Sequence, residues 1–302
     1  MYKNLNPSSL GVSGRQSELI ELTLTYGFRG LDLDAADFLK RATLQGVEEA
    51  GKYIRSAKIK IGGWVLPVQL GADEAIFQPE VERLAALTET AQKLGFHYCT
   101  AAIQPANDAL PYHENFERHR EQLSKVGDVL AASNLRLGLG LKATAESRRD
   151  RAYPFIHKAE ELLTLIRTTG HSHVGLALDT WNWKVGGGTM QHLADLNGSQ
   201  IVTVTIADVP ADADLATIEA SQRFMPTEET IPAYAQFAVS LTERKYEGPV
   251  TLLPASRHVS GMTRDNNIDK CALLLEQIWS QAGLTKPGRP GLAAAEFAPR
   301  EA

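Results

Sequence analysis

The most informative stretch for chemistry is an apolar run that ends in a carboxylate. Residues 174–179 read Val-Gly-Leu-Ala-Leu-Asp, and the run is followed by Trp181, Asn182 and Trp183. A strand that ends in this way brings its acid to the mouth of a parallel barrel, where such folds keep their catalytic groups. Asp179 is therefore the first catalytic candidate. The alternative is a structural acid that holds neighbouring loops by hydrogen bonds.

Lys142 and His258 are the other two catalytic candidates. Side chains two residues apart on a strand share a face, so Gly138, Gly140 and Lys142 are expected to point into the same space as Asp179. We hypothesise that the Lys142 ammonium neutralises Asp179 or polarises a substrate oxygen. A Schiff base on Lys142 remains an alternative. His258 follows the last predicted strand, at the same mouth.

Polar and aromatic residues near the other predicted strand ends are candidates for substrate binding. The flat faces of Trp181 and Trp183 suit the C–H side of a sugar ring. Trp64 is expected in the core, and His97 at the barrel end away from the mouth. The predicted substrate-binding set is Asp32, Asp34, Gln69, Gln104, Trp181, Asn182, Trp183, Asp208, Arg223 and Glu228.

These residues need a scaffold that brings distant segments to one mouth. Short strand-like runs alternate with longer segments of helical periodicity, which is typical of a parallel sheet built from βα units. Strands are predicted near 7–12, 29–34, 59–67, 97–103, 135–141, 174–179, 200–206 and 249–253. These runs predict the α/β class and a single-domain (β/α)8 TIM barrel. A doubly wound open sheet stays possible, although no glycine-rich phosphate loop follows the first predicted strand.

The domain boundaries follow from composition. We expect the barrel to occupy residues 1–283 and a tail rich in Pro, Gly and Ala to occupy residues 284–302. The long irregular stretch 208–228 is expected to be a lid or substrate loop.

Several segments, in order and spacing, resemble the xylose-isomerase-like barrels, which include sugar and sugar-phosphate isomerases and epimerases. The segments are Gly27-Phe-Arg-Gly-Leu-Asp-Leu, Asn134-Leu-Arg-Leu-Gly-Leu, Val174-Gly-Leu-Ala-Leu-Asp-Thr, Val202-Thr-Val-Thr-Ile-Ala-Asp208 and Tyr246-Glu-Gly-Pro-Val-Thr-Leu. Arg223 with Met225-Pro-Thr-Glu228 also resembles the substrate loop of that family. The resemblance covers most of residues 5–280.

The resemblance also implies a divalent cation held by a glutamate, an aspartate, a histidine and a glutamate on strands five to eight. The matching positions of this sequence are Gly140, Asp179, Thr205 and Leu253, and Asn182 stands where a further histidine is usual. A hard divalent cation needs several anionic or strongly polar ligands. We therefore predict a degenerate metal site with no metal and no other cofactor.

A shift of one or two residues in this comparison does not restore the ligands. Glu146 is the nearest acid after strand five, and strand eight offers no acid between Pro249 and Arg264. A site rebuilt from His258 or Asp208 remains an alternative.

Composition limits the partners. A formal net charge of −5, with scattered basic residues, gives no reason to expect nucleic-acid binding. The first residues lack the apolar core of a signal peptide, and no apolar run approaches the ~20 residues of a membrane helix, so we expect neither. The 2 cysteines suit a reducing compartment, so we expect a soluble cytoplasmic protein without membrane contact that could form a homo-oligomer.

Two functional classes remain open. We predict the first class, in which the chain is a catalytically degenerate relative that binds a small carbohydrate or sugar phosphate. In the second, it is a metal-independent isomerase, epimerase or lyase on a small carbohydrate, using Asp179 with Lys142. The fold alone does not choose between them, because function belongs to the site.

Overall fold

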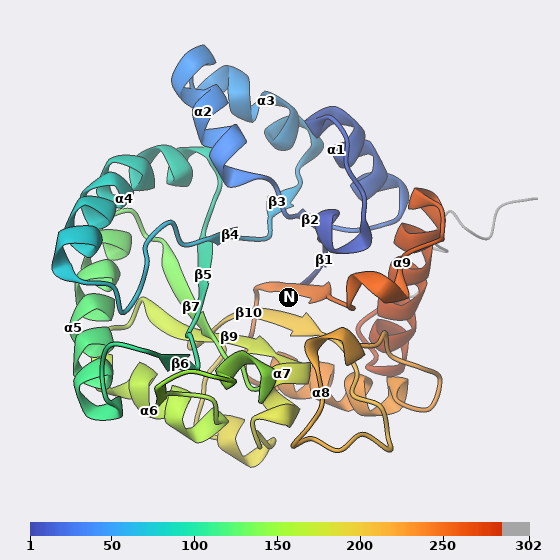
Figure 1. Ribbon diagram of the computed structural model, residues 1–302. Coiled ribbons are helices and arrows are strands. Elements are labelled where there is room, and N and C mark those ends of the chain that lie inside the picture. Colours follow the sequence, from blue (N-terminus) through green and yellow to red (C-terminus); the bar gives the residue numbers. More distant parts are fainter. Residues whose placement is uncertain (286–302) are drawn as a thin grey trace, which may run out of the picture.

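The computed structural model describes residues 1–285, and these form a parallel barrel inside a ring of helices (Figure 1). The barrel strands are β1 (Tyr2–Leu5), β2 (Gly30–Leu31), β3 (Lys60–Ile61), β4 (Trp64–Val65), β5 (Tyr98–Ala102), β7 (Arg136–Gly140), β9 (Val174–Asp179), β10 (Ile201–Ile206) and β11 (Pro249–Leu252). A small antiparallel pair, β6 (Ala106–Asn107) with β8 (Tyr153–Pro154), forms a second sheet separate from the barrel sheet.

The strand order shows how the barrel closes. The sheet runs β3-β2-β1-β11-β10-β9-β7-β5-β4, and its neighbours pair in parallel. Its two end strands, β3 and β4, are halves of one segment interrupted by Gly62 and Gly63. A Cβ on Gly62 would overlap the side chains of Asn4 and Asp32, so only glycine fits there. The nine strands therefore fill eight barrel positions, as the TIM-barrel prediction requires.

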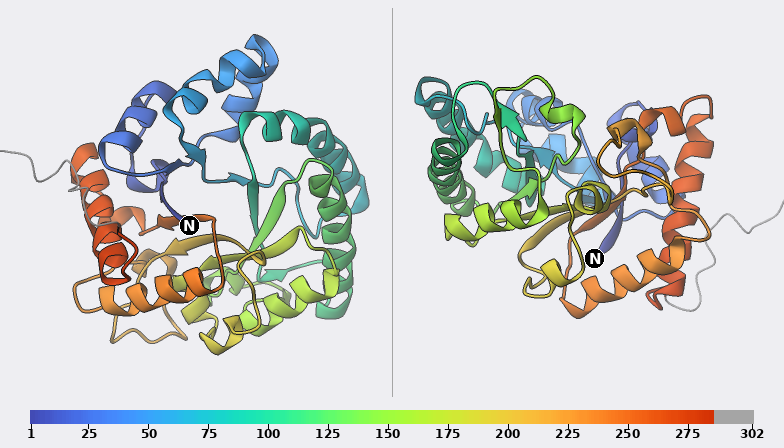
Figure 2. Two further views of the ribbon diagram at one scale, coloured as in Figure 1. Left: turned by 180° about the vertical axis from the view of Figure 1, so that it is seen from behind. Right: turned by 60° about the horizontal axis from the view of Figure 1, so that its bottom comes forward.

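Helices connect successive barrel positions and cover the outside of the sheet, as the view from behind also shows (Figure 2). They are α1 (Gln16–Thr25), α2 (Ala35–Gln45), α3 (Val47–Ala57), α4 (Glu74–Leu94), α5 (Tyr112–Ala131), α6 (Ala159–Thr169), α7 (Thr180–Val185), α8 (Ile231–Glu243) and α9 (Arg264–Gln281). Within residues 1–285, no helix is both long and apolar enough to cross a membrane.

Alternation along the strands places the core between the sheet and the helices. Leu137, Leu139, Leu176 and Leu178 are at most 1% exposed and belong to one large hydrophobic cluster. Burial of such side chains is the main favourable term for the fold, at roughly 25 cal/mol per Å² of apolar surface. Trp64 lies in the same cluster, as predicted.

The first strand was misplaced by the sequence prediction. It lies at Tyr2–Leu5, whereas residues 8–10 form a single 3-10 turn within the stretch 7–12. Pro7 has no N–H to continue a sheet ladder, and the Asn6 side chain accepts a hydrogen bond from the Ser9 backbone, which starts a turn. Leu10 is buried all the same, which accounts for the apolar signal. The other predicted strands overlap observed ones.

The predicted domain boundary stays a prediction. The tail expected from residue 284 lies outside the described residues, apart from 284 and 285.

Candidate functional site

Asp179 is the last residue of β9 and the N-cap of α7. Its Oδ1 accepts hydrogen bonds from Arg223 Nη1 at 3.0 Å and from the Asn182 backbone N–H at 2.7 Å. Its Oδ2 accepts from Arg223 Nη2 at 2.6 Å and from Thr205 Oγ1 at 2.8 Å. Each carboxylate oxygen therefore has two donors, and one carboxylate joins β9, β10 and the loop that carries Arg223.

Arg223 reaches this site from the long loop between β10 and α8. Its Nε donates to the backbone oxygen of Leu253 at 3.2 Å, directly after β11. The guanidinium carbon lies 5.4 Å from the Trp181 ring centroid, a favourable cation–π distance. The side chain is only 11% exposed. Arg223 thus ties the loop to the ends of two barrel strands.

The surroundings of Asp179 favour its charged form. Burial by itself would raise its pKa, but the charge and hydrogen bonds of Arg223, with the Asn182 N–H and the Thr205 hydroxyl, hold the pKa below its ordinary value. A carboxylate that is fully ionised and fully hydrogen-bonded is a weak general base at neutral pH. The structural alternative for Asp179 therefore fits its contacts better than a catalytic role.

The donor set at this mouth does not fit a divalent cation. The four positions that would supply ligands hold Gly140, Asp179, Thr205 and Leu253, and the carboxylate is already bound to the Arg223 guanidinium. In residues 1–285, no group of three or more His, Cys, Asp or Glu side chains is placed to hold a metal ion.

The residues considered as replacement ligands make contacts of their own. Glu146 Oε1 accepts from the Ala220 backbone N–H at 2.9 Å. Asp208 Oδ1 accepts from the Tyr234 hydroxyl at 3.2 Å. His258 Nε2 lies 3.2 Å from the Ser221 backbone oxygen.

His258 also packs its ring on Phe224, with centroids 4.0 Å apart. It is therefore held against the loop that carries Arg223, and this is a structural contact beside the predicted chemical role.

The predicted pairing of Lys142 with Asp179 was wrong, because the cation that neutralises Asp179 is Arg223. Lys142 Nζ instead donates to Gln104 Oε1 at 3.1 Å. Lys142 follows β7, and strand parity could not tell which of two cations would reach the acid. The structure does bring Lys142 and Gln104, both predicted site residues, together beyond the ends of β7 and β5.

The predicted sugar-stacking role of Trp181 and Trp183 is not favoured by their burial. Trp181 is 0% exposed and Trp183 is 7% exposed. Their indole N–H groups donate to the backbone oxygens of Gln222 and Thr189. The chain enters α7 directly after Asp179, so both rings are buried and neither presents a free face to a ligand.

A second polar cluster surrounds Asp32, the residue after β2. Asn4 Nδ2 and Asn6 Nδ2 donate to its two oxygens, each at 2.9 Å. Asn4 Nδ2 also lies 3.0 Å from Thr251 Oγ1 in β11. Burial raises the pKa of Asp32 to about 6, although both amide hydrogen bonds lower it. A carboxyl group with this pKa can exchange a proton near neutral pH.

Sequence reasoning missed Asn4 and Asn6. They were missed because the first strand was predicted at residues 7–12. A strand at residues 2–5 would have placed a polar side chain, at position 4, in an otherwise buried segment. A buried asparagine is uncommon enough to serve as a signal. Asn4 is 2% exposed, and its Oδ1 has no hydrogen-bond partner among the described residues.

The remaining predicted residues have local roles or none. Asp34 caps α2 by accepting from the Asp37 backbone N–H at 3.1 Å. Gln69 is bound through its backbone and side-chain nitrogens to Glu80, at 2.7 and 2.8 Å. The Asn182 side chain accepts from the Ala143 N–H after β7. Glu228 is exposed. None of these contacts joins the Asp179–Arg223 pair, apart from the Asn182 backbone bond.

Comparison with known proteins places this geometry in a family. Residues 20–274 match the family described as the xylose isomerase-like TIM barrel. A xylose isomerase domain protein from Alicyclobacillus acidocaldarius superposes with a TM-score of 0.81 at 22% identity, covering 93% of this chain and 99% of that chain. No curated protein matches the chain.

Two further solved structures share the fold at lower identity. The IolI protein, solved with a bound zinc atom, has a TM-score of 0.75 at 15% identity, covering 93% of this chain and 99% of that chain. D-Psicose 3-epimerase from Clostridium cellulolyticum H10, solved with D-tagatose, has a TM-score of 0.69 at 15% identity with the same coverage. Since the family match covers most of its length, the chain belongs to the xylose isomerase-like TIM barrel family.

Proposed function

We propose that this protein is a carbohydrate-binding member of its family in which Arg223 has taken the place of a divalent cation. One observation carries the proposal. The Arg223 guanidinium binds Asp179 with two nitrogens and the Leu253 backbone with the third. It therefore contacts the residues at two of the four positions that would supply metal ligands. The arrangement fits ligand binding better than metal-dependent isomerisation.

The ligand class follows from the polar groups near the mouth and from the relatives. Solved structures with a similar fold include proteins named D-psicose 3-epimerase, solved with D-tagatose, and L-ribulose 3-epimerase, and these names point to small ketoses. In this chain the Lys142–Gln104 pair offers an ammonium and an amide, and Asp32 with Asn6 offers a carboxyl and an amide. Such groups bind sugar hydroxyls, and the ammonium also suits a phosphate.

The test combines metal analysis with ligand binding. Purified protein is analysed for bound metal, and thermal unfolding is followed with Mn²⁺, Mg²⁺, Co²⁺ and Zn²⁺. We expect no stoichiometric metal and no shift. A panel of ketoses and ketose phosphates is then titrated calorimetrically against the wild type, Lys142→Gln and the surface control Lys125→Gln. Weaker binding in Lys142→Gln alone supports the proposal.

Two results would overturn it. The first is a stoichiometric divalent metal that is lost in Asp179→Asn, since a metal ion would then bind Asp179 in place of the Arg223 guanidinium. The second is the absence of binding by every ketose and ketose phosphate in the panel.

A second candidate function is metal-independent proton transfer on a small carbohydrate, with Asp32 as the base. The pKa of about 6 for Asp32 favours it, because the group is then largely ionised at neutral pH yet basic enough to accept a proton. Incubation of ketoses with chelator-treated protein in D₂O tests it by NMR. Deuterium entering beside the carbonyl, and lost in Asp32→Asn, would replace the binding proposal with a catalytic one.

The lyase alternative has its own readout at Lys142. Borohydride reduction in the presence of keto sugars would fix a Schiff base on that lysine as a mass adduct. We expect no adduct, because the Lys142 ammonium already donates a hydrogen bond to Gln104 Oε1 at 3.1 Å.

A further inference from the structure

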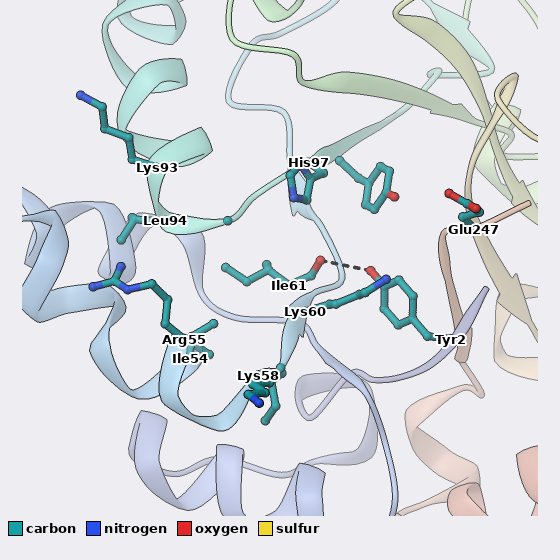
Figure 3. Close-up of a pocket in the computed structure, with 13 residues that line it drawn as sticks. Tyr2, Ile54, Arg55, Lys58, Lys60, Ile61, Lys93, Leu94, His97 and Glu247 are labelled. Atoms are coloured by element: carbon teal, nitrogen blue, oxygen red, sulfur yellow. Dashed lines mark hydrogen bonds between the residues drawn. The ribbon is translucent and has the colours of Figure 1, made fainter.

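A cavity of about 490 Å³ lies near the starts of several barrel strands, and Figure 3 shows the side chains that line it. It is lined by residues at the starts of β1, β3 and β5 and by the last turns of α3 and α4. Strand starts lie at one end of a parallel barrel and strand ends at the other, so this cavity is separate from the mouth. Its volume is in the usual range of small-molecule sites.

The lining carries a strong excess of positive charge. Arg55, Lys58, Lys60 and Lys93 line the cavity, and Glu247 is the one acidic residue among its lining residues. The whole chain has a formal charge of −5, so this end reverses the sign of the molecule locally. A concentration of one sign in a concave site raises the local concentration of the opposite ion.

Two of these cations have an ordinary structural explanation. Arg55 and Lys93 lie in the last turns of α3 and α4, where positive charge balances the helix dipole. They also pair with acids of their own helices, Glu48 at 2.7 Å and Glu89 at 2.6 Å. These two residues alone therefore do not indicate a ligand site.

Lys58 and Lys60 lack such partners. Neither forms an ion pair within 4.0 Å with any acid among residues 1–285. The Lys60 ammonium lies 4.7 Å from the Tyr2 ring centroid, and Figure 3 shows its side chain directed toward that ring. A cation–π contact stabilises an ammonium but leaves its charge uncompensated.

The neighbouring titratable groups respond to this charge. Burial lowers the pKa of His97, and the charge of Lys60 lowers it further. The pKa of the Met1 amino group is lowered by the same two causes in the same order. The Tyr98 hydroxyl, also in the lining, makes no hydrogen bond to the described residues and can donate to a ligand.

We propose that this cavity binds a small, multiply charged anion of the phosphate class, with Lys58 and Lys60 as its main cationic contacts. His97 and Tyr98 supply further donors. The site lies at the far end of the barrel from the mouth, so the inference stands independently of the carbohydrate-binding proposal.

The test is calorimetric titration of the full chain with pyrophosphate and with inorganic phosphate at low ionic strength. Each lysine replaced should weaken pyrophosphate binding about tenfold, since a charge-assisted hydrogen bond is lost. Lys60→Gln and the double variant Lys58→Gln/Lys60→Gln are compared with Lys52→Gln, which removes the same charge from α3 outside the cavity. The control should change the affinity less than twofold.

An NMR readout separates a bound anion from general charge effects. Pyrophosphate should raise the pKa of His97, because a nearby anion stabilises the imidazolium, and the signal is assigned by its loss in His97→Gln. Equal weakening by Lys52→Gln, an unresponsive His97, or no saturable binding would overturn the proposal. A loss of pyrophosphate affinity in Lys142→Gln would also overturn it by placing the anion at the mouth.

Discussion

Replacing Arg223 by methionine removes the only cation paired with Asp179 among the described residues. The Arg223 and Asp179 side chains are 11% and 15% exposed, so the pair is nearly buried. Breaking a buried pair on one side costs about 3–5 kcal/mol, since the remaining charge loses its compensation. The Thr205 hydroxyl and the Asn182 N–H still bind the carboxylate. We therefore expect the free energy of unfolding to fall by about 3 kcal/mol at pH 7, near the lower end of that range.

The pH dependence identifies the cause of that loss. In the wild type the folded pKa of Asp179 is lowered, so its stabilisation is present above the unfolded value of 3.8 and is lost as pH falls through the lower folded value. In Arg223→Met burial dominates, so the folded pKa of Asp179 rises above the unfolded one. The penalty then applies at neutral pH and shrinks as pH falls through the raised pKa. The difference between the two proteins should narrow toward pH 4.

Urea unfolding of four proteins measures this: the wild type, Arg223→Met, Asp179→Asn and the double variant. The free energy of unfolding of the double variant should fall by less than the sum of the two single-variant decreases, because the double variant leaves no buried charge without a partner. Arg167→Met, on the exposed face of α6, serves as the control for losing an arginine. A loss below about 1 kcal/mol that does not change with pH would refute the buried-pair reasoning.

Three further predictions concern the barrel interior and the buried tryptophan, and urea unfolding measures each of them. The folded pKa of Asp32 is raised from 3.8 to about 6, so its contribution to the free energy of unfolding is full below pH 3.8 and is lost as pH rises through 6. Within that window, Asp32→Asn should remove a slope in the free energy of unfolding of up to about 1.4 kcal/mol per pH unit. Gly62→Ala should destabilise by about 1–3 kcal/mol through overlap with Asn4 and Asp32, whereas Gly140→Ala should be close to neutral because its new Cβ meets nothing nearer than 3.8 Å. Trp181→Ala should cost about 3–5 kcal/mol, and equal stability would mean that the ring is not buried.

The barrel could be predicted because its signal is local. In β9 and β10 the apolar residues alternate with small or polar ones, and the observed strands lie at Val174–Asp179 and Ile201–Ile206, close to the prediction. Alternation of this kind depends only on the pleat of a strand. β1 could not be predicted from alternation, because Asn4 interrupts its apolar pattern. The Asn4 side chain contacts Asp32 and Thr251, which are distant in sequence.

The partner of Asp179 could not be predicted for a related reason. Strand parity says which side chains share the barrel interior, but Arg223 lies 44 residues from Asp179 in an irregular loop with no periodicity. The path of such a loop is decided by tertiary contacts, here an isolated bridge between Asp208 and Phe224 and the burial of Trp181 beneath it. Sequence reasoning placed Arg223 among the site residues and assigned the neutralising role to Lys142.

The proposed replacement of a divalent cation by Arg223 has a chemical consequence. A divalent ion keeps coordination positions open and can polarise substrate oxygens placed there. A guanidinium has one charge and five N–H groups in a fixed plane, and three of its nitrogens already donate to Asp179 and Leu253. Two N–H groups remain, enough to bind a hydroxyl but in fixed directions. The second candidate function, proton transfer on a small carbohydrate, therefore assigns that step to Asp32, whose pKa of about 6 suits it.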